Sequence, residues 1–283
     1  MSTIPVIWSW QEFVDRAAAP DTIPAGSGRH GDSAWAGATW LEALALARRG
    51  WSQPLPEVAV AISALREGLS DRLGVPSLAP VWDVTGGEVD VAVYLSCAPE
   101  CMIDHEPRQA SAQGRVVTIL VPAWYEHHVP HDQVLNRGMA IAALCSAIVR
   151  VAHSVEIWSG AAYRVPARLP VQFRDRFSAV ARVVSAGEPL DIGRLIFAMA
   201  HPAMLRRLWL GVWDSAEPTV AERARDQGGY GIPCECEVGD LPGERANAYV
   251  LPYLAPNQPQ WQSMESAVLW CLNTFATLGL TSR

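Results

Sequence analysis

The chain has 283 residues, half of them hydrophobic, and a formal net charge of −7. This length and composition allow a sizeable buried core, whereas the excess of carboxylates disfavours a broad grip on nucleic acid, which requires a positive surface. The longest apolar run, 138–149, is shorter than the roughly 20 residues of a membrane-spanning helix, and the first residues do not resemble a signal peptide. We therefore expect a cytoplasmic protein without a membrane partner.

The first part of the chain predicts helices followed by short strands. Leucines at near-helical spacing predict a helix that ends before Gly50, a residue suited to the C-terminal cap. Alternating valines after the Gly86-Gly87 turn predict the second strand of a pair. The predicted elements are helices over 39–49 and 56–73 and strands over 81–84 and 89–95. We assign residues 1–110 to an N-terminal α+β portion.

The second part changes to an α/β rhythm. A continuous apolar run over 116–121 predicts a central strand, which is followed by a polar loop and a long helix over 132–152. A short strand over 155–158 completes a strand–helix–strand unit, and such a unit implies a parallel sheet. Helical spacing also predicts a buried face on the long helix. The residues of that face are Leu135, Met139, Cys145 and Ile148.

The remaining sequence predicts further elements of the same domain. Asp191 is placed to cap a helix, and Pro202 must kink or restart it. The apolar run 205–213 predicts a strand, and the polar, glycine-rich stretch 215–247 predicts a surface excursion. A strand over 249–254 and a helix over 261–278 close the chain. We assign residues 111–283 to one α/β domain.

The order of strand, polar loop, long helix and strand over 115–158 resembles the opening of a von Willebrand A domain. The resemblance implies a Rossmann-like parallel sheet flanked by helices. In that family the loop carries Asp-x-Ser-x-Ser, whose oxygens bind a divalent cation. Here the loop reads Val121-Pro122-Ala123-Trp124-Tyr125-Glu126, without the aspartate or the serines. We therefore predict no metal in this loop and no cofactor.

Several short segments resemble uncharacterised proteins that phages and prophages encode. The segments are Trp-Ala-Gly-Ala-Thr-Trp-Leu-Glu-Ala-Leu at 35–44, Ala-Arg-Arg-Gly-Trp at 47–51, Asp-Val at 90–91 and Pro-Glu-Cys-Met at 99–102. The resemblance covers most of the chain. It implies a phage or mobile-element setting and no particular reaction.

The loop after the 116–121 strand is the predicted partner-binding site. Ligands of open α/β sheets bind outside the carboxyl ends of the strands, where this loop begins. Its aromatic and imidazole side chains suit packing against a partner, with Trp124 as the candidate anchor. The predicted binding residues are Trp124, Tyr125, Glu126, His127, His128 and His131.

Cysteines and a histidine supply weak candidates for a structural zinc site. A helix starting at Pro99 would place Cys101 and His105 on one face, and soft ligands of this kind suit zinc. The spacing differs from the Cys-x-x-Cys of common zinc sites, so we predict buried thiols and no metal. The candidate ligands are Cys97, Cys101, His105, Cys234 and Cys236.

Three functions fit these observations. The leading interpretation is a non-enzymatic interaction or scaffold protein of a phage or mobile element that binds a protein or nucleic-acid partner, of which we favour the protein. The second is a hydrolase or transferase in which a thiol is activated by a histidine, since a nucleophilic cysteine needs a base within reach. The third is an accessory protein that recognises structured RNA or DNA through local arginine patches, such as Arg48-Arg49 and Arg206-Arg207. Their positions near predicted helix ends also suit helix capping.

Overall fold

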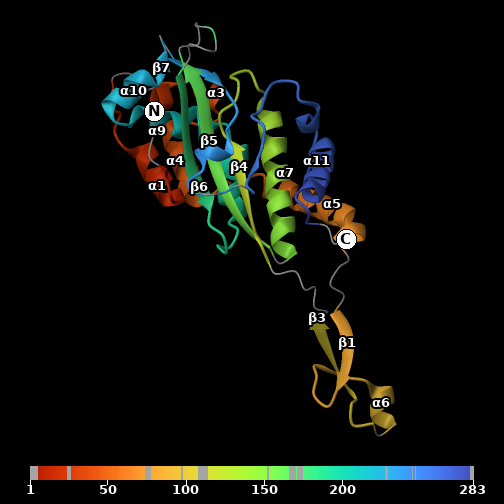
Figure 1. Ribbon diagram of the computed structural model, residues 1–283. Helices are drawn as coiled ribbons and strands as arrows, with labels where there is room; N and C mark the ends of the chain where they lie inside the picture. The colour runs from red at the N-terminus through yellow and green to blue at the C-terminus, as the bar shows by residue number, and fades with distance from the viewer. Residues whose placement is uncertain are drawn as a thin grey trace.

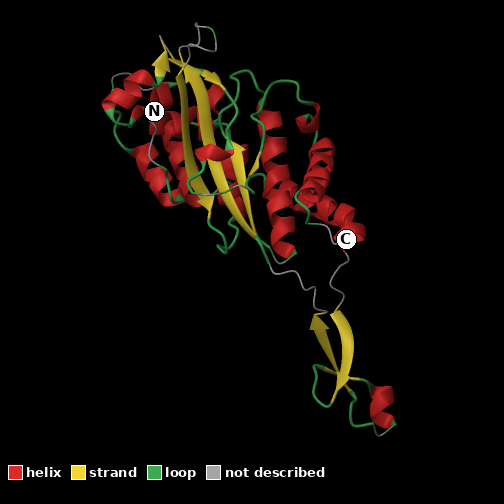
Figure 2. Ribbon diagram, viewed as in Figure 1, coloured by secondary structure: helices red, strands yellow, loops and turns green. Residues whose placement is uncertain are grey.

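The computed structural model describes residues 6–23, 27–73, 78–96, 98–107, 114–151, 153–165, 170, 175–226, 229–243, 245 and 247–280. They form a body in which helices pack against a central sheet, and a small unit that projects away from it (Figure 1). The small unit contains β1 (Leu78–Asp83), α6 (Val91–Leu95) and β3 (Met102–Pro107). Figure 2 shows the same division by secondary structure. The fold is α/β, as predicted. None of the described helices is long and apolar enough to cross a membrane.

The central sheet is mixed, and the prediction of a parallel sheet is wrong in this respect. Its strand order is β10 (Tyr249–Val250), β4 (Val116–Pro122), β5 (Ser154–Val165) and β6 (Asp175–Val184), with β9 (Ile232–Pro233) beside one end of β5. β10, β4 and β5 are parallel, as the strand–helix–strand unit predicts, but β6 and β9 run antiparallel to β5. Only residues 166–174 separate β5 from β6, and a parallel neighbour would require a crossover connection of about a dozen residues or more.

The two faces of the sheet are covered differently. Alternate residues such as Ile119, Ile157 and Ala179 belong to the large core that the helices complete. On the other face, Leu120, Trp158 and Val180 form a smaller cluster with Cys236 and Leu241 from the segment that follows β9. Because both faces are covered, β4 is buried from Val117 onward, which explains its continuous apolar run.

The helices of the body come from both halves of the chain. The longer ones are α1 (Trp10–Ala18), α4 (Trp40–Arg49), α5 (Leu55–Leu73), α7 (His131–Arg150), α8 (Ile192–Ala200) and α11 (Met264–Thr277). The short ones are α2 (Ser27–His30), α3 (Ser33–Ala36), α9 (Leu210–Asp214), α10 (Pro218–Arg223), the π-helical turn η2 (Met204–Trp209), and the 3-10 turns η3 (Val238–Asp240) and η4 (Pro259–Trp261). β7 (Arg225–Asp226) and β8 (Gly229–Tyr230) form a small ladder.

Local capping sets several of these boundaries. Thr39 and Glu42 form a reciprocal capping box at the start of α4, and Gly50 ends that helix with a positive φ of 80°. Asp191 accepts from the backbone N–H of Arg194 and caps α8, as predicted. These caps explain why the helix boundaries in this part of the chain follow from the sequence.

Helix α7 is largely buried, with 13 of its 20 residues inside the body. The predicted core positions Met139, Cys145 and Ile148 are buried, whereas Leu135 is only half-buried. At Gly138 the helix lies so close to α8 that an added Cβ would meet Cα of Ala200 at 2.5 Å. The predicted buried face is therefore confirmed for its middle and C-terminal turns.

Three predicted elements have a different secondary structure. The run 205–213 is helical, because Leu205, Leu208 and Val212 recur at helical spacing and the segment is buried on all sides. The predicted strand over 89–95 contains only β2 (Glu88–Val89) before the short helix α6 (Val91–Leu95). Finally, β3 (Met102–Pro107) replaces the helix expected after Pro99.

A small projecting unit is formed by residues 78–107, and we call it the hairpin unit. β1 (Leu78–Asp83) and β2 both pair antiparallel with β3. The helices before it, α1, α4 and α5, share one core with the C-terminal half. The predicted domain boundary at residues 110–111 lies outside the described residues.

The outer side of β6 is covered by the first described residues. Ile7 is fully buried and forms a parallel bridge with Ala181. Its N–H donates to Val180, and its carbonyl accepts from the N–H of Arg182, at 3.0 and 2.9 Å. Part of this edge strand therefore already has its backbone partner.

Candidate functional site

An aromatic cavity lies at the carboxyl end of β4, where the sequence predicts the binding site. We call it the carboxyl-edge pocket; its volume is about 770 Å³. The loop after β4 contributes Trp124, Tyr125, Glu126 and His127 to its lining. The remaining walls come from Trp35, from η2 and the start of α9, and from the glycine-flanked segment 229–233.

Trp124 forms the buried floor of this pocket. Only 4% of its surface is exposed, and its ring stacks on Tyr163 of β5 with centroids 4.4 Å apart. Tyr163 contacts Phe177 and Trp213 in turn, so the stack continues into the core. The structure thus places Trp124 inside the wall, where it supports the pocket, and not on the surface as a projecting anchor.

Tyr125 is also buried and lies beside the guanidinium of Arg206, whose Cζ is 5.3 Å from the Tyr125 ring. Burial raises the pKa of Tyr125 to about 12, against the opposing charges of Arg206 and Arg137. The phenol is therefore a hydrogen-bond donor at neutral pH. Its Oη has no partner among the described residues.

Arg206 fixes the mouth of the pocket from η2. It is 2% exposed, and its Nη atoms donate to the backbone carbonyls of Trp35, His127 and Val129. Nη1 also lies 2.8 Å from Nε2 of His131, and the guanidinium stacks over the Trp35 ring. Its Nε has no partner among the described residues. Burial lowers the pKa of Arg206, but an arginine retains its charge.

Two other buried arginines hold loops in the same way. Arg207 donates to the carbonyls of Ala38, Gly28 and Gly31. Arg137 of α7 donates to Pro122 at the end of β4 and to Pro252 beyond β10, and burial lowers its pKa to about 10. Within the described part of the chain, none of the three arginines has an ion-pair partner. They bind carbonyls, which keeps the loops around the pocket in place.

Arg206 and Arg207 are adjacent in the π-helical turn η2, and both are buried. Every residue of η2 is buried, and the two guanidinium groups bind the carbonyls of different loops. Both arginines lie in the last turn of η2, where they bind these carbonyls. Arg48-Arg49 likewise lies in the last turn of α4, as predicted.

The predicted histidines take separate positions around the pocket. Of the three, only His127 lines it, and its ring lies 3.7 Å from that of His128 between centroids. His131 begins α7 and lies near the carbonyl of Trp35. Glu126 lies on the lining beside them, half-buried. Four of the six predicted residues therefore line one cavity, and two of these, Trp124 and Tyr125, are buried in its wall. His128 and His131 do not line it.

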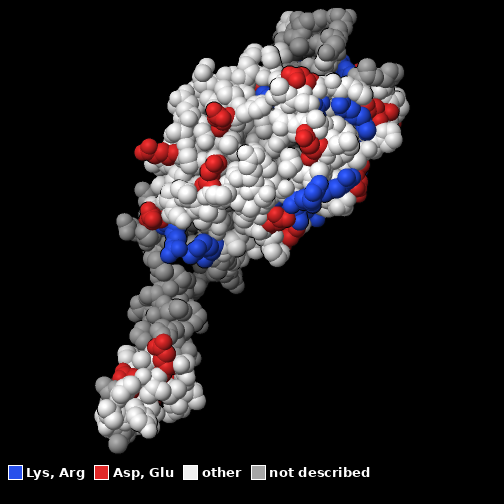
Figure 3. Space-filling model, turned by 180° about the vertical axis from the view of Figure 1, so that it is seen from behind, with Lys and Arg blue, Asp and Glu red and all other residues white. Residues whose placement is uncertain are grey.

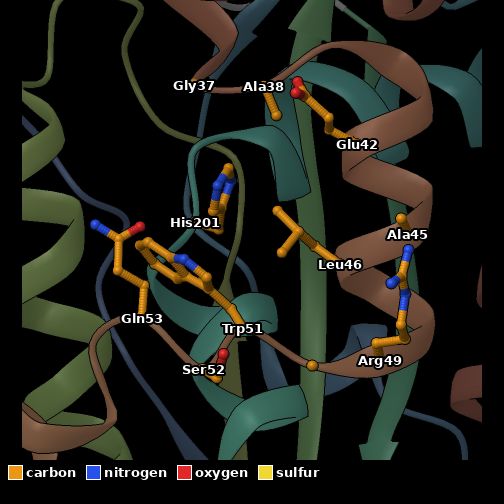
Figure 4. A pocket seen from close by; sticks show the side chains of 11 residues that line it. Gly37, Ala38, Glu42, Ala45, Leu46, Arg49, Trp51, Ser52, Gln53 and His201 are labelled. Atoms are coloured by element: carbon orange, nitrogen blue, oxygen red, sulfur yellow. The ribbon is translucent and has the colours of Figure 1, made fainter.

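A second cavity of about 680 Å³ lies between α4 and the residues that follow it (Figure 4). The rings of His201 and Trp51 meet there edge to face, 4.5 Å apart. The N–H of Ala203 donates to Nδ1 of His201, which places the proton of the neutral ring on Nε2. Burial, and then the charge of His131, lower the pKa of His201 to about 4. This imidazole is neutral at pH 7.

The candidate zinc ligands that the structure describes lie in different parts of the molecule. Cys97 lies outside the described residues, and nothing is described of the side chain of His105. Cys101 precedes β3 in the hairpin unit, whereas Cys234 and Cys236 follow β9 in the body. Across the described ranges, no three His, Cys, Asp or Glu side chains are grouped as metal ligands.

Sequence reasoning missed three parts of the pocket wall: Trp35, Arg206 and the segment 229–233. One signal was present, because Arg206-Arg207 interrupts an otherwise apolar run. Charged residues in such a run are buried only when they have specific partners. The partners here are carbonyls from loops about 75 to 180 positions away in sequence, which no local pattern identifies.

Fold and site together define an α/β protein with an aromatic pocket at the carboxyl ends of its parallel strands. The chain belongs to the family described as Domain of unknown function (DUF7192), whose model matches residues 2–282. The expectation of an uncharacterised family is thereby confirmed. No curated protein and no solved structure matches the chain.

Proposed function

We propose that this protein is a non-enzymatic interaction protein whose carboxyl-edge pocket binds an apolar segment of a protein partner. The observation that carries the proposal is an aromatic cavity whose lining residues include two buried donors without a partner among the described residues, Tyr125 Oη and Arg206 Nε. Buried polar groups are normally hydrogen-bonded, so donors of this kind beside a cavity suit an acceptor on a bound partner. A backbone carbonyl of a bound segment supplies such an acceptor.

The walls favour the apolar part of that segment. Trp35 is partly exposed at the mouth, and Leu205, Leu210 and Ile232 line the pocket with it. Tyr230 completes this side, and its hydroxyl bonds Asp214. Aromatic side chains in a cavity with fixed walls are typical anchors for partner binding.

A thiol-dependent enzyme has less support. Burial raises the pKa of Cys145 to about 12, and it also raises the pKa of Cys271 and Cys236. A nucleophilic cysteine requires the opposite shift, toward the thiolate. None of the described cysteines lines the carboxyl-edge pocket.

A nucleic-acid function also has less support. Arg206 and Arg207 are 2% and 1% exposed and already bind carbonyls, so they offer no surface to phosphate. On the face drawn in Figure 3, arginines occur in small groups interspersed with carboxylates. Such a surface does not release counterions as a continuous basic patch does.

The proposal keeps two finer elements from the sequence. The succession of β4, polar loop, α7 and β5 supports kinship with the von Willebrand A domain, in a form without its cation loop. The segments that resemble phage-encoded proteins support a setting in a phage or mobile element. Inspection of the neighbouring genes checks the second element directly.

The test begins with peptides selected from a random display library on the full-length protein. Each selected peptide is synthesised and titrated calorimetrically. We expect Trp35→Ala to weaken binding by about tenfold or more, as for an aromatic anchor, and Tyr125→Phe to weaken it by about threefold to tenfold, as for one lost hydrogen bond.

Trp82→Ala is the matched control, because Trp82 is exposed in the hairpin unit, away from the pocket. Thermal melts establish that the variants fold. Peptides that bind Trp35→Ala and Tyr125→Phe as tightly as wild type would contradict the proposal. So would peptides whose binding is lost only in Trp82→Ala.

A further inference from the structure

The hairpin unit is organised by local hydrogen bonds. Asp90 accepts from Nε1 of Trp82 at 3.0 Å and from the N–H of Val93 at 3.1 Å, so one carboxylate joins β1 to the start of α6. The N–H of Asp90 also donates to the carbonyl of Cys101, just before β3. The unit therefore has a defined shape, although it is far too small for a core of its own.

Its apolar side chains are exposed. Six of the sixteen exposed large hydrophobic residues in the described part of the chain lie within 82–95. Val91, Tyr94 and Leu95 are 63%, 61% and 74% exposed, and their spacing places them on one side of α6. The other three are Trp82, Val84 and Val89. Scattered exposed apolar residues are ordinary, but such a concentration marks an interaction surface.

The charge of the unit has a single sign. Six of the 29 acidic residues and none of the 22 arginines fall within 78–107, which therefore carries −6 of the net −7. Figure 3 shows acidic side chains and no basic ones on the described part of this projection. Carboxylates around apolar side chains attract a positive surface and repel nucleic acid or anionic lipid.

We infer that the hairpin unit is a second docking surface, and that its occupant is a basic, apolar surface of a partner protein. Tyr94, Leu95 and Trp82 supply the apolar contact. The carboxylates, such as Glu88 and Glu100, pair with arginine or lysine at its rim and steer the approach of the partner. This inference is independent of the carboxyl-edge pocket, because the two sites share no residue.

The experiment uses the full-length protein and an amphipathic helical peptide of leucine and arginine as the probe. Two matched peptides replace either every arginine by glutamate or every leucine by serine. Binding is measured by fluorescence anisotropy at low and high salt. We expect only the leucine–arginine peptide to bind, and its affinity to fall with salt because exposed charges are screened.

The decisive variant is the double substitution Tyr94→Ser with Leu95→Ser, and Leu41→Ser is its control. Leu41 is 76% exposed on α4, so it tests exposure alone. The double variant should weaken binding by about tenfold, as expected for the loss of interface anchors, while Leu41→Ser binds as wild type does. Equal binding by the double variant, or by the serine–arginine peptide, overturns the inference.

Two further outcomes separate this surface from its alternatives. If sedimentation shows wild type to dimerise and the double variant to be monomeric, the occupant is a second copy and the basic partner is wrong. Trp35→Ala should leave binding of the leucine–arginine peptide unchanged. A loss in that variant would assign the peptide to the carboxyl-edge pocket instead.

Discussion

The body and the hairpin unit differ in which side chains they bury and which they expose. In the body, Arg137, Arg206 and Arg207 are buried against carbonyls, and the aromatic residues stack beneath them. In the hairpin unit, carboxylates surround aromatic and aliphatic side chains that are exposed. The comparison shows that the overall charge of −7 describes neither region: buried cations hold the pocket, while anions gather on the projection.

The largest test of this comparison substitutes one tryptophan in each region. Trp124→Ala removes a buried ring that stacks on Tyr163, so we expect a loss of about 3–5 kcal/mol in the free energy of unfolding. Trp82→Ala removes a ring that is 47% exposed and should change stability by less than about 1 kcal/mol. Urea denaturation measures both. Similar losses in the two variants would show that the hairpin unit is packed against something in solution.

The second test compares a buried with an exposed arginine. Arg206→Met leaves the carbonyls of Trp35, His127 and Val129 unpaired and should cost about 2–4 kcal/mol, because buried unpaired acceptors are costly. Arg49→Met at the exposed end of α4 should stay within about 0.5 kcal/mol. Urea denaturation again measures both changes in the free energy of unfolding. If Arg206→Met is as stable as wild type, the arginine does not hold the loops.

The third test measures how the free energy of unfolding changes at low pH, where the buried imidazole of His201 becomes protonated. The pKa of His201 is about 4 in the folded protein and 6.5 in its ordinary range, so protonation favours the unfolded chain. Stability from this group is complete above pH 6.5 and is lost as the pH falls toward 4, by up to about 3 kcal/mol. His201→Gln lacks this term, so its stability should fall less than that of wild type over the same window. Parallel pH profiles of the two proteins would refute the assignment.

The smallest test removes one carbon from a buried side chain and two from an exposed one. Ile148→Val in the buried face of α7 should cost about 1 kcal/mol, whereas Val91→Ala on α6 should cost less than about 0.5 kcal/mol. Thermal melts of both variants give the difference. If Val91→Ala costs as much as Ile148→Val, the exposed side of α6 is covered in solution.

The sequence correctly predicts the elements whose boundaries are set by residues within or next to them. The capping residues Thr39 and Asp191 and the apolar run of β4 correctly predict α4, α8 and a central strand. β6 was missed although Phe177, Ala179, Ala181 and Val183 alternate with Ser178 and Arg182, because small residues give a weak strand signal. The run 205–213 was misread because full burial erases the polar side by which a helix is recognised.

The sequence predicts where the pocket lies but not which residues form its walls. The rule that ligands bind at the carboxyl ends of parallel strands correctly places Glu126 and His127 on a cavity. Trp124 lies beneath the cavity because it stacks on Tyr163 of β5. The two residues are far apart in sequence and meet only through the pairing of the strands, which no local pattern predicts. The exposed hairpin unit was read as ordinary strands because alternation of valines does not reveal whether either face is covered.

The bridge between Ile7 and β6 has a consequence for handling the protein. β6 is an outer strand of the sheet, and an uncovered outer strand pairs with strands of other molecules. Ile7 occupies the backbone groups of Val180 and Arg182 that would otherwise serve as this template. Proteolytic clipping or a bulky fusion near Ile7 would therefore favour edge-to-edge aggregation, even though every side chain of the carboxyl-edge pocket remained in place.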